Sequence, residues 1–102
     1  MNVKISNQIG NYDGRAVPYV ELEVLGDKHT LSVRKYPKNV SVVMWKNSDK
    51  NGTKVSLKMP HDKFDFTTHV SDMVCNFSTE IELDVMNILE EKWDYATKVN
   101  NF

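Results

Sequence analysis

Residues 19–24 read Tyr-Val-Glu-Leu-Glu-Val, six positions at which apolar and polar side chains alternate without a break. Because successive side chains of a β-strand point to opposite faces, this alternation predicts a strand that buries Val20, Leu22 and Val24. A sheet with one apolar face needs a second element to cover it. The stretch therefore predicts a sheet that forms one layer of a two-layer domain.

The same period of two recurs on both sides of this stretch. Further strands are predicted at about residues 3–6, 30–36, 40–46 and 54–59. Turn-forming residues separate the strands at 10–15, 25–28, 37–39 and 48–53. The last of these turns contains Asn51-Gly52, the strongest hairpin signal in the chain, because Asn-Gly suits a two-residue turn with positive φ. The pattern predicts an antiparallel sheet of about five strands.

A long helix is predicted over residues 79–98. Glu80 and Glu82 lie in its first turn and Lys98 lies near its end, which suits the helix dipole. Its apolar residues recur at helical spacing and form one broad face: Ile81, Val85, Ile88, Leu89, Trp93, Ala96 and Val99. The apolar face of the sheet is the partner that such a helix needs. Residues 1–102 are therefore expected to form a single α+β domain, with the sheet packed by this C-terminal helix.

Residues 60–77 fit two structures. Phe64, Phe66, Thr68 and Val70 alternate as in a strand. A stripe at helical spacing instead predicts a short helix near residues 69–76, although Thr67, Thr68 and Val70 are poor helix formers; the stripe contains Phe66, Val70, Met73, Val74 and Phe77. Because Cys75 lies on this apolar segment, we expect a buried, unreactive thiol.

Several functional classes have no support in the sequence. A single cysteine excludes an intrachain disulfide and a cysteine-based zinc site. His29, His61 and His69 lack a second ligand pair at a diagnostic spacing, and the four glycines do not form a phosphate-binding loop. We therefore expect a protein that is not an enzyme and has no catalytic residues, metal or cofactor.

No membrane association is expected either. No apolar run approaches the roughly 18 residues that a membrane span requires, and the first residues lack the apolar core of a signal peptide. The expected location is the cytoplasm. The chain has 11 Lys, 2 Arg and 10 Asn, which is typical of an AT-rich genome such as that of a low-GC bacterium or its phages. For a phage protein the location would be the host cytoplasm.

The net charge of -1 hides a strong asymmetry. Residues 28–58 contain eight basic residues and one acidic residue, whereas residues 65–102 contain two basic and eight acidic residues. If the apolar side chains of the central strands face the helix, cations and aromatic rings lie together on the other face. Such a face suits single-stranded nucleic acid, since phosphates need the charges and bases stack on the rings. The predicted binding residues are Arg34, Lys35, Tyr36, Lys38, Trp45, Lys46, Lys54 and Lys58.

Two features weaken this prediction. Lysines on a solvated face also keep a small protein in solution and protect edge strands from pairing. In addition, Glu21 and Glu23 share the outward face of their strand, and they dilute the positive charge if that strand adjoins residues 30–36. The interpretation as nucleic-acid binding thus depends on the arrangement of the strands.

The acidic C-terminal region favours an alternative function. A small inhibitor or adaptor, encoded by a phage or mobile element, would bind a basic surface of a host protein through these carboxylates. The candidate partner-binding residues are Glu80, Asp84, Glu90, Glu91 and Asp94.

Self-association is a further expectation. The apolar face of the C-terminal helix is broad for so small a sheet, and an uncovered apolar face usually marks an interface. We therefore predict a two-fold dimer through this helix. In the competing interpretation, residues 64–77 cover the helix and the chain is a monomer.

Overall fold

The computed structural model describes residues 2–49, 52, 54–76 and 86–99, and these residues form one antiparallel sheet and two α-helices. The strands are β1 (Asn2–Tyr12), β2 (Arg15–Leu25), β3 (His29–Lys35), β4 (Asn39–Lys46) and β5 (Lys54–Pro60). The helices are α1 (Phe66–Asn76) and α2 (Met86–Val99). Short 3₁₀ turns, Asn47–Asp49 and His61–Lys63, flank β5. The predicted α+β class, with a five-stranded sheet and a C-terminal helix, is confirmed.

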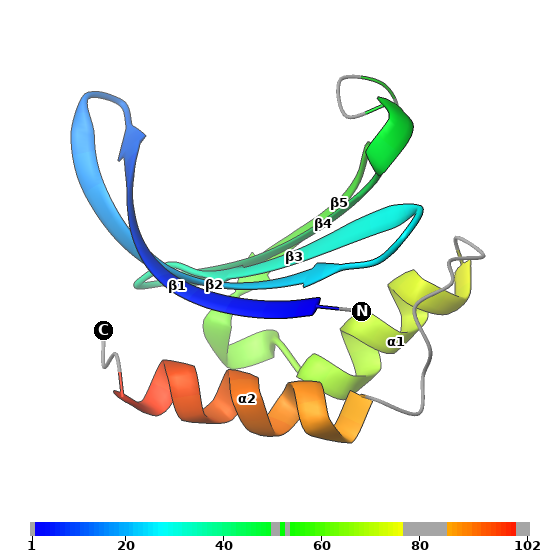
Figure 1. The fold of residues 1–102 in the computed structure, drawn as a ribbon. Helices are drawn as coiled ribbons and strands as arrows, with labels where there is room; N and C mark the ends of the chain where they lie inside the picture. Colours follow the sequence, from blue (N-terminus) through cyan, green and yellow to red (C-terminus); the bar gives the residue numbers. More distant parts are fainter. Residues whose placement is uncertain (1, 50–51, 53, 77–85, 100–102) are drawn as a thin grey trace.

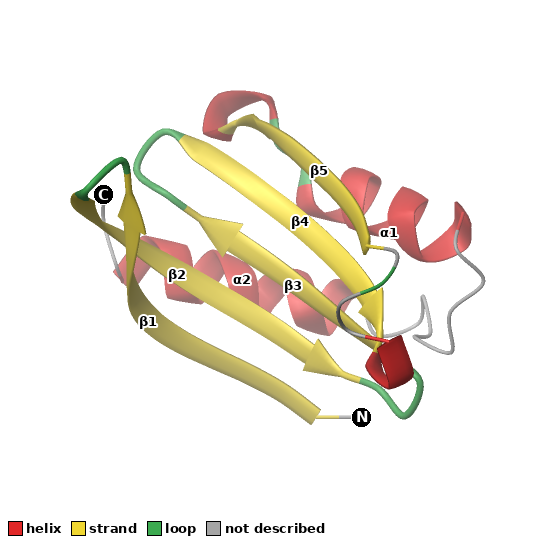
Figure 2. Cartoon of the chain, turned by 90° about the horizontal axis from the view of Figure 1, so that it is seen from above, coloured by secondary structure: helices red, strands yellow, loops and turns green. Residues whose placement is uncertain are grey.

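The strands follow one another across the sheet in the order β1-β2-β3-β4-β5, and each pair is antiparallel (Figure 2). Both helices lie on the same side of the sheet (Figure 1). The sheet is bent, so that the tip of the β1–β2 hairpin and the opposite end of β4 and β5 rise away from the helices (Figure 1). The face without helices is therefore concave.

The first hairpin is longer than the sequence predicted. Strand β1 spans 11 residues, whereas only residues 3–6 were expected in it, and the expected loop over residues 10–15 is wrong. Only Asp13 and Gly14 leave the strand conformation, with φ of 50° and 78°. Asp-Gly suits a two-residue hairpin turn, because both central residues of such a turn need positive φ. Tyr12 and Arg15 are consequently paired across the end of the hairpin.

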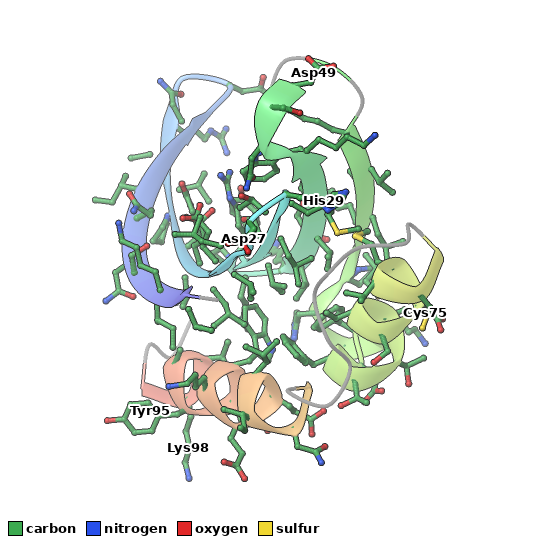
Figure 3. The ribbon with its side chains drawn as sticks, turned by 45° about the vertical axis from the view of Figure 1, so that its right-hand side comes forward. Asp27, His29, Asp49, Cys75, Tyr95 and Lys98 are labelled. Carbon is green, nitrogen blue, oxygen red and sulfur yellow. The ribbon has the colours of Figure 1, made fainter. Side chains whose placement is uncertain are left out.

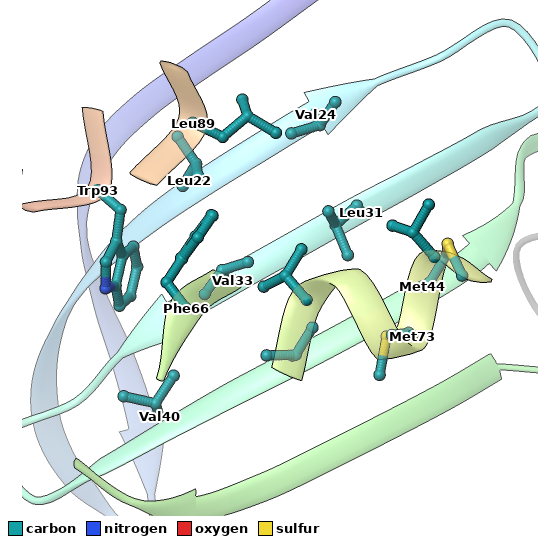
Figure 4. Packing of buried hydrophobic residues seen from close by; sticks show 13 residues of the cluster. Leu22, Val24, Leu31, Val33, Val40, Met44, Phe66, Met73, Leu89 and Trp93 are labelled. Atoms are coloured by element: carbon teal, nitrogen blue, oxygen red, sulfur yellow. The ribbon is translucent and has the colours of Figure 1, made fainter. Parts of the chain in front are cut away.

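The core lies between the sheet and the helices (Figure 4). Every apolar residue expected to point inward from β2, β3 and β4 is at most 2% exposed: Val20, Leu22, Val24, Leu31, Val33, Val40, Val42 and Met44. Val55 and Leu57 are only partly buried, because β5 lies at the edge of the sheet. The period of two therefore identified the buried face correctly.

Residues 66–76 form a helix, one of the two structures that the sequence allowed. Asp65 caps it, since the Thr68 amide donates a hydrogen bond of 3.0 Å to its carboxylate. The His69 amide donates to the Asp65 carbonyl over 2.9 Å. Phe66, Val70, Met73 and Val74 are buried against the sheet. The cap and this packing outweigh the low helix propensity of the threonines.

Helix α2 confirms the predicted C-terminal helix over residues 86–98, while residues 79–85 of that prediction lie outside the described chain. Leu89, Trp93 and Ala96 are buried, and the Trp93 ring lies 5.9 Å from Phe64 and 5.8 Å from Phe66 between centroids. Phe64 and Phe66 thus cover part of this face within one chain, whereas Ile88, also expected on the apolar face, is 54% exposed. The dimer predicted through this helix gains no support from the arrangement.

In the part of the chain that the structure describes, no helix is long and apolar enough to cross a membrane. Helix α2, the longer of the two, spans 14 residues.

The packing predicts a large effect at the centre of the sheet. Leu22→Ala should lower the free energy of unfolding by about 2–5 kcal/mol, because a fully buried side chain is lost and a cavity remains. Ile88→Ala on α2, where the side chain is 54% exposed, is the matched control and should change it by less than about 0.5 kcal/mol. Urea denaturation followed by circular dichroism measures both. Equal effects of the two variants would contradict the described core.

The cap of α1 predicts a pH-dependent contribution to stability. Hydrogen bonds from Thr68 hold the pKa of Asp65 below its ordinary value. The ionised cap therefore stabilises the fold fully above the unfolded-state pKa of about 3.9, and this contribution is lost as the pH falls through the lower folded-state pKa. Asp65→Ala should melt below the unsubstituted protein at pH 7, and the difference in Tm should shrink below about pH 4. A difference that does not change with pH would contradict the role of the charge.

Candidate functional site

A row of polar residues crosses the open face of the sheet. Glu21 of β2 lies opposite Arg34 of β3, which lies opposite Ser41 of β4, which in turn lies opposite Lys58 of β5. All four alternate with core residues and therefore face away from the helices. The adjacency of β2 and β3 places Glu21 beside the predicted cations, the arrangement in which it was expected to dilute their positive charge.

Glu21 is buried although it lies on the open face. Glu21 is only 8% exposed, and the neighbouring Ser32 is 1% exposed. The Ser32 hydroxyl donates a hydrogen bond of 2.7 Å to Glu21 Oε2, and Arg34 Nε donates one of 2.8 Å to the same oxygen. Because the sheet is concave, its centre is shielded from solvent on this face as well. The Glu21 charge is thus compensated within the protein.

Arg34 links this buried carboxylate to two aromatic rings. Its guanidinium carbon lies 5.0 Å from the centroid of the Tyr19 ring, within cation–π range. The Tyr19 and Tyr36 rings are 5.1 Å apart between centroids. Burial opposes the charge of Arg34, but side-chain hydrogen bonds to Tyr36 and Glu21 and the negative charge of Glu21 outweigh it and raise its pKa. The guanidinium therefore stays charged at every physiological pH.

These residues line a hollow of about 760 Å³ in the open face. The hollow lies between the β1–β2 hairpin and the turn from β3 to β4, and no Asp or Glu is among the described residues that line it. Both arginines of the chain line it, although the chain has only two arginines against 11 lysines. Its lining brings together four cations and two rings: Arg15, Arg34, Lys38, Lys58, Tyr19 and Tyr36.

The predicted binding residues separate into three groups in the structure. Arg34, Tyr36, Lys38 and Lys58 line the hollow. The second group consists of Trp45 and Lys54. The third group consists of Lys35 and Lys46.

Trp45 and Lys54 lie on the same face but nearer the other end of β4. The Lys54 ammonium is 6.0 Å from the centroid of the Trp45 ring. Trp45 lies four positions beyond Ser41 along β4, so this pair is about 13 Å from the polar row. The pair is therefore a second, smaller group of a cation and a ring.

Lys35 and Lys46 lie on the face of the sheet that carries the helices. Each directly follows a residue of the open face, Arg34 and Trp45 respectively, and successive side chains of a strand point to opposite faces. Lys35 lies in register with the buried residues Val20 and Val40. Burial lowers its pKa, and its ammonium donates to the Tyr36 carbonyl over 3.5 Å. These two lysines are not part of the hollow.

Sequence reasoning missed Arg15 and Tyr19. Tyr19 begins the alternating stretch of residues 19–24, and its position next to Val20 already places it on the open face. Arg15 was assigned to a loop, and only the tight Asp13-Gly14 turn brings it into β2 and to the rim of the hollow. A search for Asp-Gly turns would have revealed this second residue.

The acidic residues proposed for a protein partner are not gathered at a described site. Glu80 and Asp84 lie outside the described residues. Glu90 accepts a hydrogen bond from the Thr67 hydroxyl and so links α2 to α1. Glu91 and Asp94 are exposed, on the helix from which Tyr95 and Lys98 project away from the sheet (Figure 3). Binding of a protein partner by this region stays a prediction.

The expectation of a buried Cys75 is wrong, because the residue is exposed (Figure 3). The buried stripe of α1 contains Met73 and Val74, and the next residue along the helix turns away from the sheet. His69 serves α1 locally, since its ring accepts a hydrogen bond of 3.0 Å from the Asp65 amide and stacks on Phe64. Among the described residues, no group of three His, Cys, Asp or Glu is placed to hold a metal ion.

Comparisons with known proteins give no relative from which a function can be transferred. No protein-family model matches the chain, no curated protein matches its sequence, and no solved structure matches its fold.

The buried carboxylate predicts coupled effects on stability. Arg34→Ala removes a charged donor from Glu21 and should lower the free energy of unfolding by about 1.5–3 kcal/mol. In the double variant, Glu21→Gln also removes the carboxylate charge that Arg34→Ala leaves unpaired, so part of the lost free energy of unfolding should be recovered. A double-mutant cycle in urea measures the coupling between the two side chains. Strictly additive effects would show that the pair does not act as a unit.

Proposed function

We propose that the protein binds single-stranded nucleic acid in the hollow of the open sheet face and that it is a binding module without catalytic activity. One observation supports this most directly: four cations and two adjacent tyrosine rings line a hollow whose described lining contains no carboxylate. A polyanion with exposed aromatic bases is the ligand that this combination suits.

The two kinds of side chain have different tasks in this proposal. Arg15, Lys38 and Lys58 lie around the hollow and bind phosphates of the backbone. An unpaired base stacks on Tyr36, whose ring is already held next to Tyr19. Arg34 positions the two rings, because it contacts Tyr19 on its ring face and hydrogen-bonds to Tyr36. Sequence preference is expected to be weak, since every base has a face that can stack.

The concave shape favours a single strand over a duplex. In a duplex, each base already stacks on its neighbours, and the rings in a hollow reach only a base that has left this stack. A single strand offers its bases at no such cost. Trp45 and Lys54, farther along the same face, supply a second place for a base and a phosphate.

The first test is a titration with fluorescently labelled oligonucleotides at several salt concentrations. Binding should weaken with salt, with a log–log slope of about -0.7 for each phosphate contact in a single strand. Tyr36→Ala should weaken binding about 5- to 150-fold, as expected for the loss of one stacked base, and Tyr36→Phe should keep most of the affinity because it keeps the ring. Absence of binding at about 50 mM salt would end the proposal.

Matched lysine variants distinguish the hollow from a general charge effect. Lys58→Ala removes a cation from the hollow, whereas Lys98→Ala removes one from α2 on the other side of the molecule. Only the first should weaken binding and reduce the salt slope, by about 0.7. Equal losses in both variants would contradict the assignment of the site.

The buried carboxylate gives an independent prediction with the opposite sign. Glu21→Gln preserves a hydrogen-bonding side chain next to Arg34 but removes the negative charge beneath the hollow. Affinity for an oligonucleotide should therefore rise, and the gain should diminish at high salt because it is electrostatic. Unchanged affinity at low salt would show that the ligand does not reach Arg34.

A further inference from the structure

Strand β1 is an edge strand without the usual protection of such strands. It lies at one end of the sheet order and pairs only with β2 in the described sheet. Edge strands usually carry charges, prolines or bulges that prevent pairing with another chain. Of the 11 residues of β1, only Lys4 is charged and none is proline. The opposite edge, β5, contains Lys54, Lys58 and Pro60 within seven residues.

Two isoleucines of β1 expose apolar surface on one side of the strand. Ile5 is 40% exposed and Ile9 is 77% exposed. They are four residues apart and therefore point to the same face, the one on which Leu22, opposite Ile5, is buried. No described side chain of the same molecule covers Ile9 sufficiently to bury it.

We propose that two copies of this chain associate through β1, antiparallel and edge to edge, about a two-fold axis at Asn7. The strand runs from residue 2 to residue 12, so Asn7 is its midpoint. A two-fold axis there pairs each residue with the residue equally distant on the other side of Asn7, and the whole strand finds a partner. The same axis pairs Ile5 with the partner's Ile9 and Ile9 with the partner's Ile5.

This register is favourable on both faces of the extended sheet. The four isoleucines meet on the side of the helices, where each covers apolar surface of another. On the open face Lys4 lies opposite the partner's Gly10, so the pairing contains no contact between like charges. An axis at residue 5 would place Ile9 opposite residue 1, and an axis at residue 9 would place Ile5 opposite residue 13, both outside the strand. The strand is therefore self-complementary, as an isologous interface requires.

The pairing also adds a cation to each candidate site. Gly10 lines the hollow, and the partner's Lys4 would lie directly across from it on the open face. The dimer itself does not depend on the proposed function. The contribution of Lys4 does rest on that function.

Sedimentation equilibrium of the full chain without ligand tests the dimer. At tens of micromolar the mass should be twice the monomer mass of 11.8 kDa. Ile9→Lys should give a monomer, because it places a charge among the apolar side chains of the interface. Ile88→Lys on α2 is the matched control and should remain dimeric. A monomeric unsubstituted chain, or a dimer lost only in Ile88→Lys, would overturn the proposal.

Cross-linking tests the register and does not depend on a destabilising variant. In a Cys75→Ser background, Asn7→Cys places two thiols across the axis, where opposite Cα atoms are about 4.5–5.5 Å apart and a disulfide can form. Oxidised glutathione should convert this variant to a covalent dimer. Asn11→Cys is the control, because its two copies would be about 27 Å apart. Circular dichroism confirms that each variant is folded, and equal cross-linking of both would refute the register.

Discussion

The apolar cluster between the sheet and the two helices is the constraint on which the rest of the structure depends. Strands β2, β3 and β4 each bury a row of aliphatic side chains on the same face, and both helices lie on that face. Phe66 from α1 and Trp93 from α2 meet there, next to the central strands (Figure 4). Once this face is covered, the other face is left for polar residues. The position of the hollow therefore follows from the packing of the core.

At the centre of the open face, the bond between Arg34 and Glu21 stabilises the fold but weakens the attraction of Arg34 for an anionic ligand. Glu21 is buried by the curvature of the sheet, and a buried carboxylate is costly unless charged or polar donors satisfy it. Ser32 and Arg34 supply these donors. The same bond reduces the positive potential that Arg34 offers to a ligand. Arg34 is thus better suited to hold the tyrosine rings in place than to bind a phosphate strongly, and that second task falls to the cations around the hollow.

The sequence predicted the fold more completely than the candidate site. Alternation over residues 19–24 and the adjacent strands identified the buried face, because a period of two depends on local geometry alone. The length of β1 could not be inferred in the same way, since residues 7–12 have little apolar alternation and are held by pairing with β2. Residues 60–77 carried both periods, and the choice of a helix rests on the Asp65 cap and on contacts distant in the sequence.

The candidate site was less predictable because it depends on curvature and on strand neighbours. Arg34, Tyr36, Lys38 and Lys58 were identified from charge and alternation, and they line the hollow. Their grouping with Arg15 requires the tight hairpin turn, and the burial of Glu21 requires the bend of the sheet. The use of arginine at position 34 is then physically reasonable in a chain rich in lysine. A planar guanidinium can donate from Nε to a carboxylate while it stacks on an aromatic ring, and an ammonium group cannot perform both tasks.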